Sequence, residues 1–164
     1  MVVLLVGIAA LVPSPLDATF GDLDASATQR SVHAPPQIRL QAREEALRDA
    51  VNAERRRNGL GPLAIDSTLQ RDARMHTADM IRFGYFGHEW HDGRSFRAWI
   101  LRRTTCDTMG EILAWSSPQQ TPGHAVRQWL DSPGHRALLL GTTWTVMGVE
   151  LTQRHAAVDF GRRC

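Results

Sequence analysis

Residues 66–84 read DSTLQRDARMHTADMIRFG, and they contain the most regular helical pattern in the chain. The apolar and aromatic positions of this stretch recur at steps of four, three, four and three, which places them on one face of an α-helix. These positions are Leu69, Ala73, His76, Met80 and Phe83. Asp66 or Ser67 can cap the amino end of the helix, and Gly84 can end it. We therefore predict a helix that buries this face and makes His76 a core histidine.

Shorter patterns on both sides of this helix predict the remaining elements. Further helices are predicted over residues 38–58, 95–102, 122–130 and 133–141. Strands are predicted over residues 108–116, 144–151 and 156–160. Because helices precede a late and small antiparallel sheet, this order predicts an α+β fold in which helices and strands form layers.

The composition is that of an ordinary globular protein. The chain has 164 residues, of which 43% are hydrophobic and 22% are charged, which is sufficient for one domain with its own core. The 19 basic residues are all arginines, and they nearly balance 17 acidic residues. The arginines are spread from Arg30 to Arg163 rather than gathered in one region. We therefore expect no nucleic-acid partner and a monomeric protein.

The amino-terminal segment predicts export. Val2 to Val12 is apolar but too short to span a bilayer, which suits the hydrophobic region of a signal peptide. Residues 1–27 are therefore interpreted as a signal-like segment or, alternatively, an uncleaved membrane anchor. Residues 28–38 are predicted to be a linker, and residues 39–164 a domain. The expected location is extracellular or in the cell envelope.

The two cysteines, Cys106 and Cys164, fit that location. A bond between them would stabilise the fold by roughly 4 kcal/mol, because it reduces the entropy of the unfolded chain. The alternative is two unrelated thiols. An exported protein meets an oxidising environment, so we expect a Cys106–Cys164 disulfide.

Three segments place a titratable side chain beside glycine or at the start of a helix. They are Gly84-Tyr85-Phe86-Gly87-His88, Gly110-Glu111 and Ser132-Pro133-Gly134-His135. Glycine lets the backbone approach closely, as the wall of a cleft requires. His91, His124 and His155 are expected to be exposed.

These segments belong to a set of six motifs that occur in one order over roughly residues 44–161. The set comprises Val51-Asn52-Ala53-Glu54-Arg55, Gly59-Leu60-Gly61-Pro62-Leu63, Ala73 to Met80, Gly84 to His88, Gly110 to Ala114 and Trp129 to Arg136. The ordered set resembles the bacterial branch of the CAP superfamily, which comprises the cysteine-rich secretory, antigen-five and pathogenesis-related proteins.

This resemblance implies an α-β-α sandwich, in which a small antiparallel sheet lies between helical layers and a cleft opens on one side. Eukaryotic relatives line that cleft with two histidines and two glutamates, and some bind a divalent metal, often zinc; bacterial members share the loss of the second glutamate. His88, Glu111 and His135 match three of these four positions, while the second glutamate falls on or near Ser132.

Three other positions depart from the family pattern. Ile112 and Leu138 stand where the family often has asparagine, which removes hydrogen bonds that can support the cleft. Glu150 stands where a small residue is usual.

The matched residues allow two kinds of site. Zinc accepts two histidine nitrogens and one carboxylate and keeps a position for water, so His88, His135 and Glu111 are candidate ligands. Glu111 is then also the candidate catalytic residue. His135 lies in the first turn of its predicted helix, where the helix dipole favours the neutral ring. The alternative is a polar cluster without metal, in which Glu111 orients the two histidines.

The resemblance therefore implies two functions. The first is a binding module for a lipid, sterol, cell-wall or protein ligand, which the missing fourth acidic residue favours. The second is a divalent-metal-dependent hydrolase that acts on a peptide or cell-wall polymer. A third reading is a structural domain of the envelope, retained by the amino-terminal segment.

Overall fold

The computed structural model describes residues 39–162 and Cys164, so the predicted signal or anchor segment and the predicted linker lie outside the described residues. The helices are α1 (Ala42–Arg57), α2 (Ser67–Phe83), α3 (Phe96–Ile100), α4 (Pro122–Asp131) and α5 (Pro133–Leu139). The strands are β1 (Ala64–Ile65), β2 (Thr108–Trp115), β3 (Val146–Leu151) and β4 (His155–Arg162). In the described part of the chain, no helix has the length and apolar character needed to cross a membrane.

The four strands form one sheet in the order β1-β3-β4-β2. The β2–β4 and β3–β4 pairs are antiparallel, as predicted. β1 was not expected, and it pairs parallel to β3 through only two residues, Ala64 and Ile65. A two-residue strand leaves no periodic signal in a sequence, because its pairing depends on the neighbouring strand.

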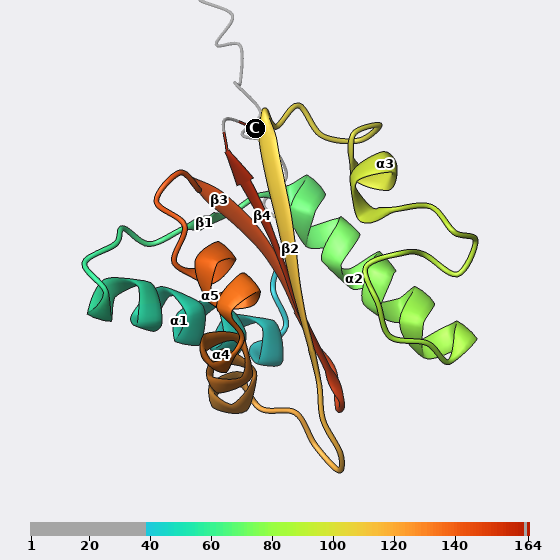
Figure 1. Ribbon diagram of the computed structural model, residues 1–164, viewed down its shortest axis with the longest axis horizontal. Coiled ribbons are helices and arrows are strands. Elements are labelled where there is room, and N and C mark those ends of the chain that lie inside the picture. The colour runs from blue at the N-terminus through green and yellow to red at the C-terminus, as the bar shows by residue number, and fades with distance from the viewer. Residues whose placement is uncertain (1–38, 163) are drawn as a thin grey trace, which may run out of the picture. The chain divides into compact units, whose positions relative to one another are not determined.

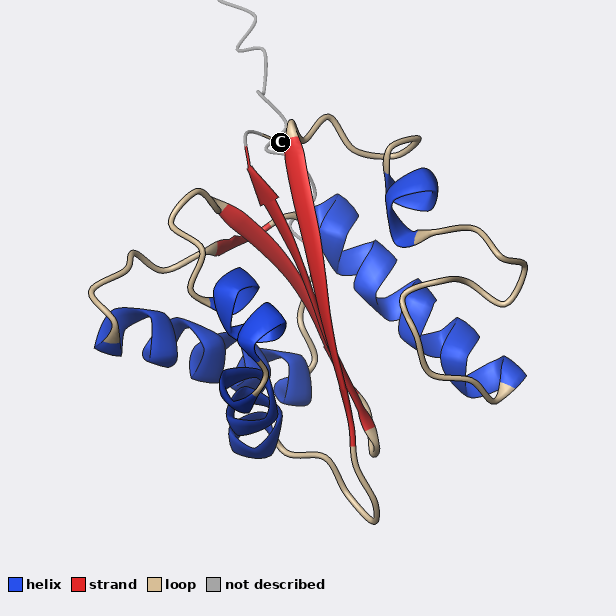
Figure 2. Cartoon of the chain, viewed as in Figure 1, coloured by secondary structure: helices blue, strands red, loops and turns tan. Residues whose placement is uncertain are grey.

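Helices cover both faces of this sheet. α1, α4 and α5 lie against one face, whereas α2 covers the other with α3 beside it (Figures 1 and 2). Successive side chains of β4 point to opposite faces, so Val158 and Phe160 join the core under α1 and α4, while Ala157 packs with Met80 of α2. The α+β fold and the α-β-α sandwich are confirmed.

Helix α2 begins and ends at the residues that the sequence indicates. The Asp66 carboxylate accepts hydrogen bonds from the backbone N–H groups of Thr68 and Leu69, both at 2.9 Å. Gly84 follows the helix in the left-handed conformation, with φ of 69°. The prediction for Phe83 was wrong: its side chain is 48% exposed and stacks on His91. Phe83 therefore contacts the loop that follows α2, whereas Met80, one turn earlier, packs on the sheet.

Helix α2 packs directly on the backbone of β3. A Cβ atom added at Gly148 would overlap the main-chain carbon and oxygen of Leu69. The Gln70 side chain bridges the same two elements, because it accepts from Val149 N at 2.9 Å and donates to Val149 O at 2.6 Å. These contacts fix the height of α2 above the sheet and thereby the position of His76.

The Val-Asn-x-x-Arg motif holds the opposite layer together. Asn52 exchanges two hydrogen bonds with the backbone of Leu63, at 2.8 and 3.0 Å. Arg55, which is 2% exposed, donates to the carbonyl oxygens of Gly61, Leu139 and Gly141. This motif therefore joins α1 to the connector and to the end of α5, and its role is structural.

The Cys106–Cys164 disulfide is confirmed. It lies against β4 at Gly161, where an added Cβ would come within 2.6 Å of Cys164 Sγ and 2.9 Å of Cys106 Sγ. The bond connects the loop before β2 to the segment after β4, which are neighbouring strands of the sheet.

Candidate functional site

Glu111 on β2 lies at the centre of the candidate site. Its side chain is 2% exposed, and each carboxylate oxygen accepts a hydrogen bond from a different histidine. The Nδ1 atom of His76 lies 2.6 Å from Oε1, and the Nδ1 atom of His88 lies 2.7 Å from Oε2. The carboxylate thus fixes two rings, one below it in α2 and one in the loop after α2.

The two rings bound to Glu111 have different surroundings. His76 is buried, as predicted, and its ring stacks on Trp90 with the ring centres 4.9 Å apart. His88 is half exposed, and it lines a cavity of about 680 Å³ that the loop after α2 forms. His76 therefore supports Glu111 from inside, whereas His88 presents its Nε2 atom outward.

His135 approaches from the other helical layer. Because β2 is an edge strand, α5 and the loop after α2 can meet around it. The ring centres of His88 and His135 lie 6.4 Å apart. We call the site formed by His88, Glu111 and His135 the histidine cleft.

A second cavity, of about 350 Å³, lies beside His135 along β2. Phe86 and Trp115 line it together with Ser132, on or near which the second glutamate of eukaryotic relatives is expected to fall. Ser132 precedes α5 in extended conformation, but its side chain makes no capping hydrogen bond. The fourth acidic group is therefore replaced by a small hydroxyl group at the wall of this cavity.

The two cleft histidines favour opposite protonation states. The hydrogen bond to Glu111 raises the pKa of His88, and burial only partly opposes this effect. Burial lowers the pKa of His135, and the nearby His88 lowers it further. Near neutral pH, His88 is the better proton donor and His135 the better proton acceptor.

The residues fit a metal only in part. Within residues 39–162 and 164, no group of three or more histidine, cysteine, aspartate or glutamate side chains could hold a metal ion. Both oxygens of Glu111 already face histidine nitrogens, so two nitrogens remain from His88 and His135. Two rings that share a tetrahedral zinc have centres about 5 Å apart, so these rings would have to move closer. The geometry differs from the expected three-ligand centre, and metal binding by these residues stays a prediction.

A second carboxylate–histidine pair lies nearby and was not expected from the sequence. Asp79 of α2 accepts a hydrogen bond from His91 Nδ1 at 2.6 Å and another from the Tyr85 hydroxyl at 2.6 Å. These hydrogen bonds, together with the stack of His91 on Phe83, hold the loop after α2 against the helix. Asp79 belongs to the Ala-x-x-His-x-x-Asp-Met motif, which was the only sequence signal for this pair.

Two further buried groups lie on the α2 face of β4. Asp159, opposite Glu111 in the sheet, is fully buried, and burial together with Glu111 raises its pKa well above the usual value. His155 was expected to be exposed, and this prediction was wrong, because only 9% of it is accessible. Its strand is covered on both faces, which the alternation of Ala156, Val158 and Phe160 did not show.

The two positions that lack the family's asparagine are filled by apolar packing. Ile112 is fully buried in the core under α1 and α4. Leu138 packs against the same core, and its carbonyl oxygen accepts a hydrogen bond from Trp144 Nε1 at 2.7 Å. The cleft is therefore supported from below by van der Waals contact rather than by amide hydrogen bonds.

Comparisons with known proteins agree with this architecture. The profile of the family described as "CAP: Cysteine-rich secretory protein family" matches residues 48–156. The Bacillus subtilis (strain 168) "Uncharacterized protein YkwD" is 35% identical over 126 residues, which cover 76% of this chain and 48% of that protein. The "Uncharacterized membrane protein YlbC" of the same organism is 28% identical over 121 residues, with 73% and 34% covered. The chain thus spans half or less of these relatives.

Solved structures show the same fold. An extracellular protein containing a SCP domain from Bacillus anthracis str. Ames superposes with a TM-score of 0.65 at 26% identity, over 77% of this chain and 45% of that one. An outer surface protein from Borrelia burgdorferi gives a TM-score of 0.68 at 23% identity, over 77% of this chain and 97% of that one. At that identity, the second likeness concerns the fold alone.

Proposed function

Because the chain belongs to the cysteine-rich secretory protein (CAP) family, we propose that it is a binding module that recognises its ligand through the histidine cleft. The ligand classes that we consider are lipids, sterols, cell-wall fragments and proteins. The proposal rests on the two hydrogen bonds that the Glu111 carboxylate accepts, one from His76 and one from His88. A carboxylate whose two oxygens accept histidine N–H groups orients those rings, and it has no oxygen turned toward a substrate.

The cleft offers the polar and apolar groups that a binding site requires. His88 and His135 present hydrogen-bonding nitrogens, while Phe86 and Trp115 supply apolar surface beside His135. Small-molecule sites commonly combine apolar walls with a few oriented polar groups.

We also propose an extracellular or envelope location. Its support is the apolar segment at Val2 to Val12, the disulfide and the likeness to the extracellular protein from Bacillus anthracis. Cell fractionation, followed by sequencing of the mature amino terminus, tests the location and separates a cleaved signal from an anchor. Recovery of the whole chain in the cytosol would contradict it.

Binding is tested with the full chain against immobilised sterols, phospholipid vesicles and peptidoglycan fragments. A ligand of the cleft is retained by the wild type and by His124→Ala, a histidine on α4 outside the cleft. His88→Ala and His135→Ala are each expected to reduce its retention at least about tenfold, because each removes from the cleft one group that can hydrogen-bond to the ligand. Equal retention by all three variants would reject the histidine cleft as the binding site.

One observation favours a second function, a divalent-metal-dependent hydrolase of peptide or cell-wall substrates. The His88 and His135 rings lie side by side with their centres 6.4 Å apart, and burial lowers the pKa of His135, which favours the neutral imidazole that binds zinc. A metal bound there would supply an activated water. His88 and His135 would hold it, and Glu111 would orient His88.

Equilibrium dialysis with zinc alone distinguishes the two functions. The hydrolase requires about one zinc per chain at micromolar concentration and the loss of that zinc in His88→Ala and His135→Ala. It also requires that zinc-dependent cleavage of peptidoglycan or casein disappears in the same variants. Absence of bound zinc from the folded wild type would reject this function and leave the binding module.

A further inference from the structure

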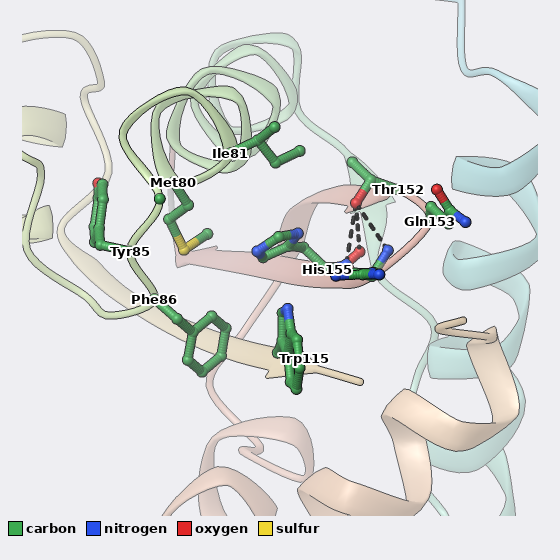
Figure 3. A pocket seen from close by; sticks show the side chains of 10 residues that line it. Met80, Ile81, Tyr85, Phe86, Trp115, Thr152, Gln153 and His155 are labelled. Atoms are coloured by element: carbon green, nitrogen blue, oxygen red, sulfur yellow. Dashed lines mark hydrogen bonds between the residues drawn. The ribbon is translucent and has the colours of Figure 1, made fainter. Parts of the chain in front are cut away.

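An apolar pocket of about 520 Å³ lies outside the histidine cleft, on the α2 face of the sheet. It is bounded by the last turn of α2, the turn after it, the end of β2 and the β3–β4 connection (Figure 3). Its volume falls in the range of small-molecule sites. The residues that carry the argument below are Met80, Ile81, Phe86, Trp115, Arg154 and His155.

Large apolar side chains are exposed at this pocket. Among the described residues five large hydrophobic side chains are exposed, and three of them line this pocket. Ile81 is 52% exposed, Phe86 50% and Trp115 43%. Exposed apolar groups that gather around a hollow indicate a binding surface, whereas isolated ones are ordinary.

His155 brings an unused polar atom into this apolar surface. The residue is 91% buried, since 9% of it is accessible, and its Nδ1 atom has no hydrogen-bond partner among the described residues. Figure 3 shows the His155 ring between Met80 and Ile81 on one side and Phe86 and Trp115 on the other. A buried polar atom without a partner is costly, so a ligand that gives this nitrogen a hydrogen bond would gain from it.

The charge at the pocket has one sign. Arg154 is the only charged side chain that lines it among the described residues, and no carboxylate does so. Burial lowers the pKa of His155, and the charge of Arg154 lowers it further, so the ring favours its neutral form. The polar end of the pocket therefore combines one cation with one neutral hydrogen-bonding nitrogen.

We propose that this pocket binds a free carboxylate amphiphile, whose aliphatic chain lies on Ile81, Phe86 and Trp115 and whose carboxylate reaches Arg154 and His155. The site contains none of His88, Glu111 and His135, although Phe86 and Trp115 line both this pocket and the cavity beside His135. The variants below therefore test the two sites separately. Guanidinium–carboxylate pairing supplies the preference for an anion.

Three probes that share a ten-carbon chain test the head group. Decanoate, decan-1-ol and decyltrimethylammonium are titrated below micelle formation into the full chain, and binding is followed by calorimetry. Decanoate is expected to bind at least about tenfold more tightly than the alcohol, and the cation is expected to bind most weakly. Equal affinities for the three probes, or tightest binding of the cation, would overturn the proposal.

Surface variants locate the binding without disturbing the fold. Arg154→Gln is expected to abolish the preference for decanoate over decanol, whereas Arg56→Gln, at an exposed arginine of α1, leaves it intact. Ile81→Ser is expected to weaken all three probes about equally, and Phe83→Ser, also exposed but outside this pocket, changes none. Unchanged affinity in both Arg154→Gln and Ile81→Ser would place the ligand elsewhere and overturn the proposal.

His155→Phe keeps a ring and removes the nitrogen, so it is expected to weaken decanoate several-fold. The Arg154 and Ile81 variants decide the case if this buried variant does not fold. His88→Ala with His135→Ala should leave decanoate binding unchanged, which separates this pocket from the cleft. Vesicles of anionic phospholipid provide the last arm: binding to vesicles without binding of monomeric decanoate would reject a free amphiphile as the ligand.

Discussion

The two faces of the sheet differ in how completely their buried polar groups are hydrogen-bonded. Under α1, α4 and α5 the largest buried polar side chains are paired: Arg55 donates to three carbonyl oxygens, and Trp129 Nε1 donates to Leu113 O at 3.0 Å. On the α2 face several polar atoms have no partner among the described residues, including both oxygens of Asp159 and Nδ1 of His155.

The same strands build both faces, so the difference comes from alternate residues of one strand. In β4, Val158 and Phe160 complete the apolar core, while His155 and Asp159 point the other way. Unpaired buried polar groups destabilise a fold, so a protein that keeps them is expected to use them for another purpose. We therefore expect most of the chemistry on the α2 face, with His135 reaching it from the opposite layer, and most of the stability from the opposite face.

The variant with the largest expected effect on stability is Phe160→Ala. Phe160 is fully buried in the core, so its loss is expected to lower the free energy of unfolding by about 3–5 kcal/mol. Urea denaturation of the full chain measures the change. A loss below about 1 kcal/mol would mean that the core on this face collapses around the cavity, contrary to the division.

Asp159→Asn, one residue earlier on the other face, is the matched control. Because burial raises the Asp159 pKa, the folded state holds a proton that the unfolded state releases, and stability falls as pH rises above the unfolded value. The asparagine variant is therefore expected to be at least as stable as the wild type at neutral pH.

Glu150→Gln tests the α2 face through the pH dependence of the free energy of unfolding. Burial and the neighbouring Glu44 raise the pKa of Glu150 to about 7, and Arg74 opposes them only in part. The wild type is expected to lose about 2–3 kcal/mol of unfolding free energy as pH rises from about 5 to 8, because the unfolded state releases its proton earlier. The variant should not show this loss. Parallel curves for both proteins would contradict the assignment.

Arg55→Ala tests whether the pairing of polar groups matters on the core side. It leaves three carbonyl oxygens without their donor and is expected to lower the free energy of unfolding by about 2–3 kcal/mol. Arg57→Ala, two residues along the same helix, removes only an exposed ion pair with Glu54 and should change it by less than about 0.5 kcal/mol. Chemical denaturation compares the two variants directly.

Ser132→Glu sharpens the comparison at the histidine cleft itself. It places a carboxylate beside His135, on or near the position where eukaryotic relatives have their second glutamate. The added carboxylate would be a third ligand beside the two histidines, and it is expected to tighten zinc binding about tenfold, which corresponds to about 1.4 kcal/mol. Equilibrium dialysis measures the change, with Ser117→Glu, an exposed serine in the loop after β2, as the control. No gain would show that the cleft cannot close on a metal.

Much of this fold was predictable because its signals are local. The step pattern of α2, its Asp66 cap and its Gly84 end depend on residues that are near one another in the sequence. The same holds for the order of motifs that identified His88, Glu111 and His135. Phe83 and His155 were placed wrongly, because periodicity shows which side chains share a face and not what covers that face.

The sequence by itself determined the helices, the main strands, the family and the neighbourhood of the cleft. Only the tertiary structure decided that Glu111 holds His76 and His88, which lie 35 and 23 residues before it, and that His155 lines an apolar pocket. The reason is physical. Local periods and caps are set by the geometry of the backbone, whereas contacts between distant residues depend on how the layers pack.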